Sequence, residues 1–354
     1  MSTANAPAGR ATAALAGLLD GLRVIDLSRN LPGPWCTRML ADLGAEVIKV
    51  EPPEGDPARA LPPLFEALNH GKVVRTVDFR QVADLDRLRE WVADADVMVD
   101  SFRPGALGAF GLGFDRLAAL NPRLVMVSIT GYGQHGAWAQ RAGHDLNFMA
   151  MSGVLDQMRS PTSGELALSN VQWGDLAAGS SAATIAVLSA VLSARRQGRG
   201  RHIDVSMTHG LHAQLVMPQA TGQLMQPLLG GHWPGAGQDL LNGALPCYNL
   251  YACADGRTMA VGALEHKFWR GVCEVLERPD WVDRHWQRGL LPHSAGSRAL
   301  HDEVAAVFRS APMATWAARF EGADACVTPV LTLDEARAHP LFQGERVQPW
   351  APVG

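Results

Sequence analysis

Short apolar runs alternate with longer segments of helical periodicity through the first part of the chain. The run 22–27 predicts a buried strand, the spacing within 35–43 predicts a helix that stops at Gly44, and 46–51 predicts a second strand. Further strands are predicted over 73–79, 96–100, 124–128 and 202–207, and further helices over 82–93 and 175–194. This alternation is typical of an α/β fold in which helices cover a parallel sheet.

Three loops in this part of the chain follow predicted strands. They span residues 28–34, 101–105 and 129–144. In open parallel sheets, ligands bind beyond the carboxyl ends of the strands. We therefore expect the functional site to be built from these three loops.

The pattern changes in the remainder of the chain. Residues 222–243 are rich in Gly, Pro, Gln and Leu without a clear period, which predicts a linker at a domain boundary. After it, Asp255-Gly256 lies between the apolar runs 246–253 and 258–262 and predicts a hairpin. A helical region over 267–320 and a strand with a helix start over 324–336 complete the pattern. These elements predict a smaller α+β domain.

Composition narrows the class of protein. Of the 354 residues, 47% are hydrophobic and 19% are charged, which is typical of a globular chain. The net charge is -4 and most arginines are scattered, so nucleic acid is not an expected partner. The five cysteines lack CxxC spacing, and the histidines lack metal-ligand spacing. We therefore expect no metal site and no disulfide framework, and a cytoplasmic location.

Apolar runs bear on the N-terminal segment and on membrane association. No uninterrupted apolar stretch reaches the roughly 18 residues that a membrane span requires, so no membrane association is expected. Residues 1–19 are interpreted as a flexible N-terminal tail rather than a targeting peptide, because a strand begins shortly after them.

Three titratable residues are candidates for chemistry. His144 precedes Asp145, and an imidazole transfers protons readily near neutral pH. The alternative is a helix cap made by Asp145 with an incidental histidine. Asp175 begins the long helix of small residues, either as a cap or as a base or nucleophile. Glu265 follows the strand 258–262 and is either a solvated glutamate or a second carboxylate that raises the pKa of the first.

Several stretches together resemble one family. They are LDGLRVIDLSRNLPGPWCTRMLADLGAEVIKVEPPEGDP, NHGK, SFRPG, AGHDLNFMAMSGV, GRGRHIDVSM, ADGRTMAVGALEHKF and DACVTPVL. In register over residues 20–345, the chain resembles the class III CoA-transferase (CaiB/BaiF) superfamily and, within it, the alpha-methylacyl-CoA racemase branch. Transferases of this superfamily usually carry a Tyr-Asp pair where the racemases carry Gly-His-Asp, and this chain has Gly143-His144-Asp145.

The resemblance implies roles for particular residues. His144 and Asp175 correspond to the two proton-transfer residues of the racemases, and Glu265 to a glutamate that reaches Asp175 from the partner subunit. The backbone N–H groups at the start of the Asp175 helix would stabilise the enolate oxygen. The positions expected to bind substrate or CoA are Asn30, Lys72, Arg103, Asp145 and Phe148.

The resemblance also implies an architecture. A large Rossmann-like, CoA-binding domain would comprise residues 20–221 and, after the chain returns to it, 321–354, while 222–320 would form the linker and the small domain. Two chains would thread through one another in an interlocked homodimer, with each active site between the large domain of one chain and the small domain of the other. Acyl-CoA would be the substrate, and no further cofactor is implied.

A few positions depart from the racemase pattern. Phe148 replaces a tyrosine that is frequent there, and Asn170 lies five rather than four positions before Asp175. Ala109 and Pro52 stand where relatives carry arginine, and loss of these cations should weaken the hold on CoA phosphates. The segment 277–289 is more similar to the transferase branch.

Three functions are therefore compared. The leading hypothesis is a cofactor-independent racemase or epimerase of 2-methyl-branched acyl-CoA, active in fatty acid metabolism. The second is a CoA-transferase that uses Asp175 as nucleophile and forms an aspartyl-CoA thioester. The third is a CoA-binding protein without turnover, which Ala109 and Phe148 favour.

Overall fold

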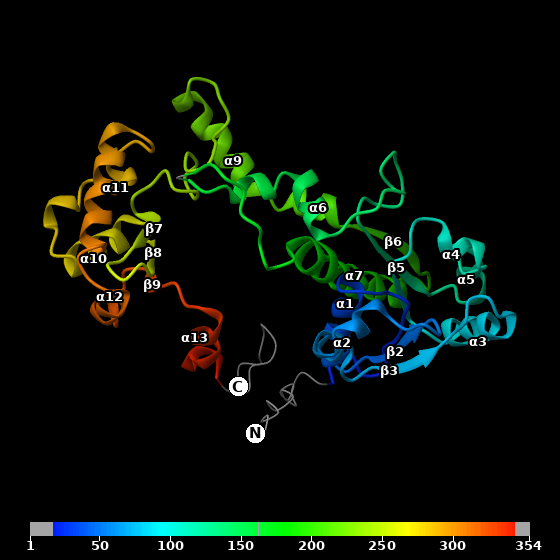
Figure 1. Cartoon of the computed structure of the whole chain (residues 1–354). Helices are drawn as coiled ribbons and strands as arrows, with labels where there is room; N and C mark the ends of the chain where they lie inside the picture. The colour runs from blue at the N-terminus through cyan, green and yellow to red at the C-terminus, as the bar shows by residue number, and fades with distance from the viewer. Residues whose placement is uncertain (1–16, 162, 344–354) are drawn as a thin grey trace. The chain divides into compact units, whose positions relative to one another are not determined.

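A computed structural model describes residues 17–161 and 163–343, which form two compact units. The first unit contains residues 17–154 and 169–214, and the second contains 155–168 and 215–342. The N-terminal tail predicted for 1–19 lies outside the described residues as far as residue 16, as do residues 344–354 at the other end. Figure 1 shows the elements of each unit.

The first unit is built on a six-stranded parallel sheet with the strand order β3-β2-β1-β4-β5-β6. The order reverses between β1 and β4, as in doubly wound nucleotide-binding folds. The Rossmann-like α/β prediction is therefore confirmed. Its strands are β1 (Arg23–Asp26), β2 (Glu46–Glu51), β3 (Val73–Thr76), β4 (Val97–Asp100), β5 (Val125–Thr130) and β6 (Arg201–Ser206).

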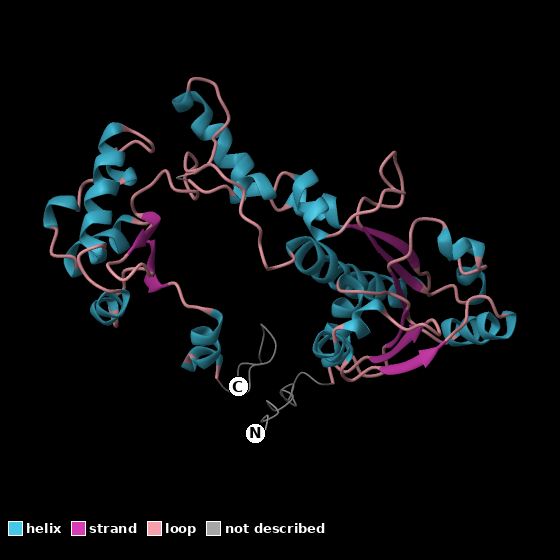
Figure 2. Cartoon of the chain, viewed as in Figure 1, coloured by secondary structure: helices cyan, strands magenta, loops and turns pink. Residues whose placement is uncertain are grey.

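Helices cover both faces of this sheet (Figure 2). One face carries α1 (Pro32–Asp42) and α7 (Ala182–Gln197), which contact β1 and β5 respectively. The other face packs the alternate strand residues Ile25, Met98 and Met126 against α3 (Val82–Ala93) and α5 (Phe114–Leu120). The remaining helices of the unit are η1 (Pro57–Ala60), α2 (Pro62–Asn69), α4 (Ala106–Ala109), α6 (Asp145–Ser152), η3 (Gly174–Ser181) and α8 (Met207–Ala213).

The helix that begins near Asp175 opens with a π-helical segment, η3, and continues as α7. Its two parts together, Gly174–Gln197, have the length and apolar composition of a membrane span, but 44% of the apolar window is buried inside the protein. Contacts with α1, β5, β6 and α8 account for the buried side. We therefore describe it as a core helix of this unit with one apolar face left uncovered.

The second unit has a three-stranded antiparallel sheet, β7-β8-β9, against a cluster of helices. The predicted Asp255-Gly256 hairpin is present, with Gly256 at φ +75. Trp269, Trp281 and Phe308 are fully buried in its core. Its elements are η2 (Leu155–Met158), α9 (Val216–Met225), η4 (Gln226–Leu229), β7 (Tyr248–Ala252), β8 (Thr258–Gly262), α10 (His266–Val275), η5 (Pro279–Trp281), η6 (Trp286–Arg288), α11 (Ala295–Phe308), α12 (Met313–Phe320), β9 (Val327–Pro329), α13 (Leu333–Ala338) and η7 (Pro340–Phe342).

The division into units differs from the predicted boundaries at three places. Residues 155–168, predicted to lie in the large domain, belong to the second unit. The predicted linker at 222 begins inside α9, so Gly222 does not end the helix. Glycine is needed there for packing, because a Cβ would lie 2.5 Å from the Trp233 ring. The predicted return to the large domain at 321 is also displaced, because β9 pairs with β8 and keeps 321–342 in the second unit.

Candidate active site

The three loops that were predicted to form the site are joined by hydrogen bonds at the carboxyl edge of the sheet. The N–H of Arg29 donates to Oγ of Ser101 at 2.9 Å, which links the loop after β1 to the loop after β4. The guanidinium of Arg103 donates to the carbonyl of Gln140 at 3.4 Å, which reaches the third loop. These contacts lie at the switch point of the strand order, where ligands of doubly wound sheets bind.

His144 and Asp175 belong to helix starts that are bonded to each other. His144 is the exposed residue directly before α6, and its N–H donates to Oδ1 of Asn147 at 3.0 Å. Asp145, the first residue of α6, accepts the backbone N–H of Asp175 on its own Oδ1 at 2.9 Å. The predicted alternative, a cap made by Asp145 for its own helix, is therefore wrong: its carboxylate holds the start of η3 instead.

Glycines permit this close approach of the two helix starts. A Cβ on Gly174 would lie 2.8 Å from Oδ1 of Asp145, in the space of the bond to Asp175. A Cβ on Gly143 would lie 2.6 Å from the ring of Phe148 and 2.9 Å from the hydroxyl of Tyr132. Both glycines therefore serve close packing at the site.

The electrostatics of Asp175 suit proton transfer near neutral pH. Burial, assisted by the neighbouring Asp145 carboxylate, raises the pKa of Asp175 from 3.8 to about 7. A group with this pKa exchanges protons readily in both directions at physiological pH. The second carboxylate was predicted to be Glu265, but within this unit Asp145 has that effect.

Two of the backbone donors predicted to stabilise the enolate are already bonded within the protein. The N–H of Asp175 is bonded to Asp145, and the N–H of Leu176 is bonded to the carbonyl of Gln172 at 2.9 Å. Both donors are therefore satisfied within the protein and are not free for a substrate oxygen.

Lys72 was predicted to bind CoA, but its contacts are internal. Its side chain is fully buried, and its ammonium donates to Oδ2 of Asp26 at 3.1 Å, to the carbonyl of Pro34 at 2.8 Å and to Oδ1 of Asn69 at 3.0 Å. An ammonium has three N–H donors, so none remains for a ligand. Although burial opposes ionisation, Lys72 and Lys49 hold the pKa of Asp26 well below its usual range.

Replacing Lys72 with methionine should destabilise the fold rather than weaken ligand binding specifically. It would leave the buried Asp26 carboxylate without its nearest cation, which typically costs about 3–5 kcal/mol. Urea unfolding at pH 7 measures this difference, with Arg75→Met, at an exposed cation on β3, as the control. A loss within 0.5 kcal/mol of the control, roughly the scale of surface substitutions, would contradict the structural role.

The other predicted binding residues have varied surroundings. Asn30 is exposed with φ +64, and its N–H donates to Asp56 at 3.1 Å. Arg103 is exposed, whereas Phe148 is buried and packs edge-on to Tyr132 at 5.3 Å between ring centroids. Glu265 is exposed and belongs to the second unit.

Two functional candidates were missed from the sequence. Arg29 places its guanidinium over the Phe102 ring at 5.2 Å, beside the switch point, where a cation suits a phosphate. Tyr132 places a hydroxyl beside Gly143, next to His144 in the chain. Its motif Gly131-Tyr132-Gly133 directly follows β5, so a tyrosine between glycines at the carboxyl end of a strand was the available signal.

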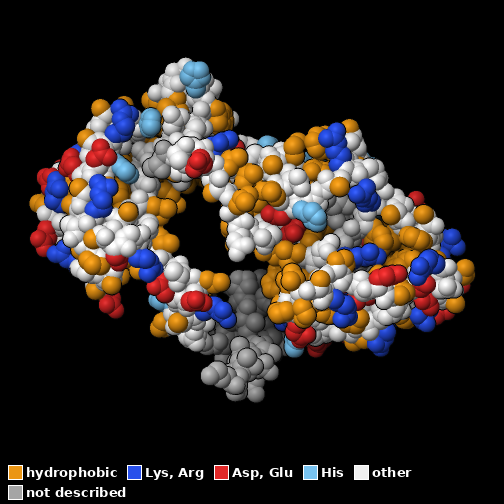
Figure 3. All heavy atoms as spheres, in the orientation of Figure 1, with side chains coloured by type: hydrophobic (Ala, Val, Ile, Leu, Met, Phe, Trp, Pro, Cys, Tyr) orange, Lys and Arg blue, Asp and Glu red, His pale blue; other side chains and the backbone are white. Residues whose placement is uncertain are grey.

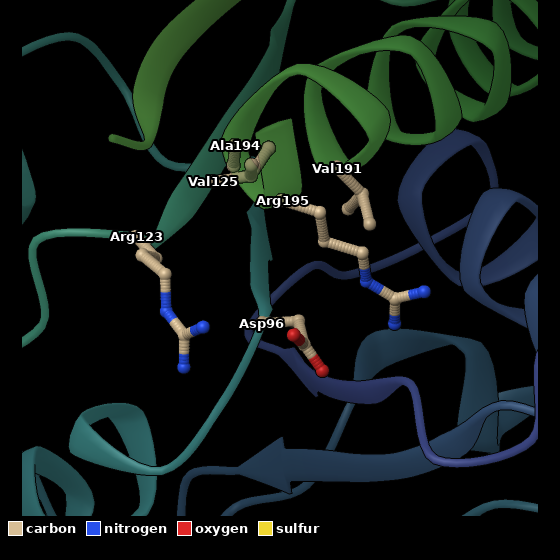
Figure 4. A pocket seen from close by; sticks show the side chains of 6 residues that line it. All are labelled: Asp96, Arg123, Val125, Val191, Ala194 and Arg195. Atoms are coloured by element: carbon tan, nitrogen blue, oxygen red, sulfur yellow. The ribbon is translucent and has the colours of Figure 1, made fainter. Parts of the chain in front are cut away.

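A separate, shallow pocket lies at the amino ends of β4 and β5 (Figure 4). Arg123 and Arg195 point into it from opposite sides, with the Asp96 carboxylate between them. Asp96 accepts the N–H of Arg23 at 3.0 Å. The pocket is therefore at the opposite end of the strands from the candidate site. Among the described residues, no group of three or more His, Cys, Asp or Glu is arranged to hold a metal ion.

A doubly wound sheet with a histidine and a carboxylate at its ligand-binding edge indicates an enzyme. The comparisons with known proteins identify its family. The model of CoA-transferase family III matches residues 19–348, and the chain belongs to this family. The fold agrees: a family structure from Brucella suis superposes with a TM-score of 0.75 at 29% identity, covering 92% of this chain and 86% of that one.

Relatives of two activities are similar to the chain. It is 34% identical to the alpha-methylacyl-CoA racemase of Mus musculus, over 91% of this chain and 80% of the relative. It is 31% identical to the succinyl-CoA:glutarate CoA-transferase of Mus musculus, over 90% and 73% respectively. The chain is therefore a member of an enzyme family that contains both racemases and CoA-transferases.

Proposed function

We propose that the protein is a racemase or epimerase of 2-methyl-branched acyl-CoA thioesters that works without a cofactor. The observation that carries the proposal is the bond between Asp145 and the backbone of Asp175, which joins the helix start after His144 to that of Asp175. Two proton-transfer groups thus come from two helices that meet at the ligand-binding edge of the sheet.

The chemistry needs one group on each face of the α-carbon. One group removes the α-proton, an enolate forms, and the other group returns a proton to the opposite face. Asp175, with its pKa raised to about 7, and His144 fill these roles in the proposal. Since the N–H groups of Asp175 and Leu176 are occupied, the Tyr132 hydroxyl is our candidate donor to the enolate oxygen.

Solvent deuterium tests this function. Each pure enantiomer of a 2-methylacyl-CoA is incubated with the enzyme in D₂O, and both deuterium at the α-carbon and loss of optical purity are measured. Both should occur from either enantiomer. If neither enantiomer gains deuterium, the racemase proposal is wrong.

The second candidate is a CoA-transferase, favoured by the similarity to the glutarate CoA-transferase. In it, an Asp175 oxygen attacks the thioester carbonyl, the C–S bond breaks and CoA thiolate leaves, giving a mixed anhydride. The thiolate then attacks the Asp175 carbonyl and releases the carboxylate, which leaves an aspartyl-CoA thioester. Hydroxylamine would trap Asp175 as a hydroxamate in this case only, because proton transfer forms no covalent intermediate.

We also propose that the chain forms the interlocked homodimer, in which Glu265 of the partner subunit approaches Asp175. The uncovered face of α7 supports an assembly, because Ile185 and Leu192 are 66% and 63% exposed on it. Exposed hydrophobic side chains also occur elsewhere on the face shown in Figure 3.

Replacing Ile185 and Leu192 together with glutamate should convert the dimer to monomers. The charges would oppose burial of this face but are tolerated in a solvent-exposed helix. Sedimentation velocity measures the change, and Leu120→Glu, at a leucine 50% exposed at the end of α5, is the matched control. A dimer that persists in the double variant would show that α7 is not part of its interface.

A further inference from the structure

Glu265 has a free carboxylate on a firmly held backbone. It is the exposed N-cap residue of α10, and no hydrogen bond or ion pair ties its side chain within the described residues of its unit. Its carbonyl accepts N–H groups of Phe268 and Trp269 at 3.0 and 3.1 Å. The backbone position of Glu265 is therefore fixed, while its carboxylate has no partner within the described residues of its own unit.

The residues on both sides of Glu265 are held by one distant segment, residues 282–287. Nε1 of Trp286 donates to the carbonyl of Leu264 at 2.7 Å, and the N–H of His266 donates to Oε1 of Gln287 at 2.9 Å. The side chain of His266 makes a second bond to this segment, because its Nε2 donates to the carbonyl of Val282 at 2.9 Å.

His285 anchors the same segment from inside. It is 1% exposed, its Nε2 lies 3.4 Å from the carbonyl of Ala263, and its Nδ1 accepts the N–H of Gln287 at 3.3 Å. One nitrogen therefore donates and the other accepts, which is the pattern of a neutral imidazole. Burial lowers the pKa of His285 and so favours this neutral form.

We infer that residues 282–287 are a positioning element that sets the place of the Glu265 carboxylate for catalysis. The inference rests on the proposed function, in which Glu265 acts beside Asp175. None of the segment's side chains needs to touch the substrate, because each acts on the backbone on either side of Glu265. We expect loss of these contacts to lower activity about 10–100-fold, as it does for residues that orient metal ligands.

The test uses substitutions at Gln287 in the full-length enzyme. Gln287→Met removes the acceptor for the His266 N–H, whereas Gln287→Glu keeps it. Arg288→Met, at the next exposed residue, is the control, because within the described residues Arg288 makes no side-chain hydrogen bond or ion pair with the Glu265 loop. We expect Gln287→Met to lower kcat about 10-fold with KM unchanged. Gln287→Glu and Arg288→Met should retain wild-type kcat.

A double-mutant cycle separates positioning from general stability. In a Glu265→Gln background, Gln287→Met should lower kcat no further, because the group being positioned is already absent. Equal losses in both backgrounds, or no loss in the wild-type background, would overturn the inference. Trp286→Phe, which removes the donor to Leu264 and keeps an aromatic ring, repeats the cycle should Gln287→Met fold poorly.

Failure of the proposed function has a different signature. Wild-type enzyme without α-proton exchange would refute the racemase assignment, and a kcat that Glu265→Gln leaves unchanged would refute the role of Glu265. Amide hydrogen exchange of residues 263–268 then still tests whether residues 282–287 hold the Glu265 loop. It should accelerate in Gln287→Met and not in Gln287→Glu, and equal protection in both variants would show that the segment does not hold the loop.

Discussion

Replacing Asp175 with asparagine should abolish interconversion of the two enantiomers, with a loss of at least about 10³-fold in rate. Asparagine keeps the backbone N–H that bonds to Asp145 and the approximate volume of the side chain, but it transfers no proton. His144 remains, so deuterium should still enter one enantiomer. Chiral analysis of the product, combined with mass spectrometry, measures both quantities.

The role of Asp175 also predicts the direction in which wild-type kcat/KM changes with pH. For the enantiomer whose proton Asp175 removes, the carboxylate must be ionised, so kcat/KM should rise with pH through about 7. For the opposite enantiomer Asp175 donates, so the inflection near 7 should be a decrease. Profiles without an inflection near 7 in either direction would contradict the role of Asp175.

A stability measurement provides the control for this variant. The folded-state pKa of Asp175 is raised from 3.8 to about 7, so its ionisation costs folding free energy above pH 4, and the full cost is present above pH 7. Asparagine removes this cost. The variant should therefore be more stable than wild type at pH 8, by at most about 4 kcal/mol, and the difference should vanish near pH 4.

Replacing His144 with glutamine should also lower interconversion about 10³-fold, but with the complementary pattern of exchange. The imidazole would be absent while Asp175 remains, so deuterium should enter only the enantiomer that Asp175→Asn cannot label. The backbone N–H of residue 144 can still donate to Asn147, which preserves this half of the capping box, and the glutamine side chain carries an oxygen that can accept in place of the imidazole.

The exposed His135, in the same loop region, is the matched control. His135→Gln should retain wild-type interconversion. If Asp175→Asn and His144→Gln lose exchange with the same enantiomer, the two groups do not act on opposite faces and the two-base mechanism fails.

Much of the fold could be predicted because the central strands of the sheet are buried on both sides. Apolar-rich segments such as 22–27 and 124–128 have few alternatives to buried strands; β1 lies within the first and β5 overlaps the second. The same pattern predicted that the site lies at the carboxyl edge of the sheet, because the direction of the strands decides which loops meet there. The unit boundaries were less predictable. Gly222 suggested a break in the chain, but it lies inside α9, where the absence of a side chain leaves room for the Trp233 ring.

The local sequence identified the candidate residues for chemistry: a histidine and an aspartate at helix starts, where backbone N–H groups favour carboxylates. Tertiary structure alone decided what each of them does. Asp145 accepts the backbone N–H of Asp175 instead of capping its own helix, and Lys72 donates to the buried Asp26. Residues 282–287 donate to and accept from the backbone on either side of Glu265. The physical reason is that hydrogen bonds and pKa shifts depend on distances of a few ångströms between segments far apart in the chain. Local periodicity carries no information about those distances.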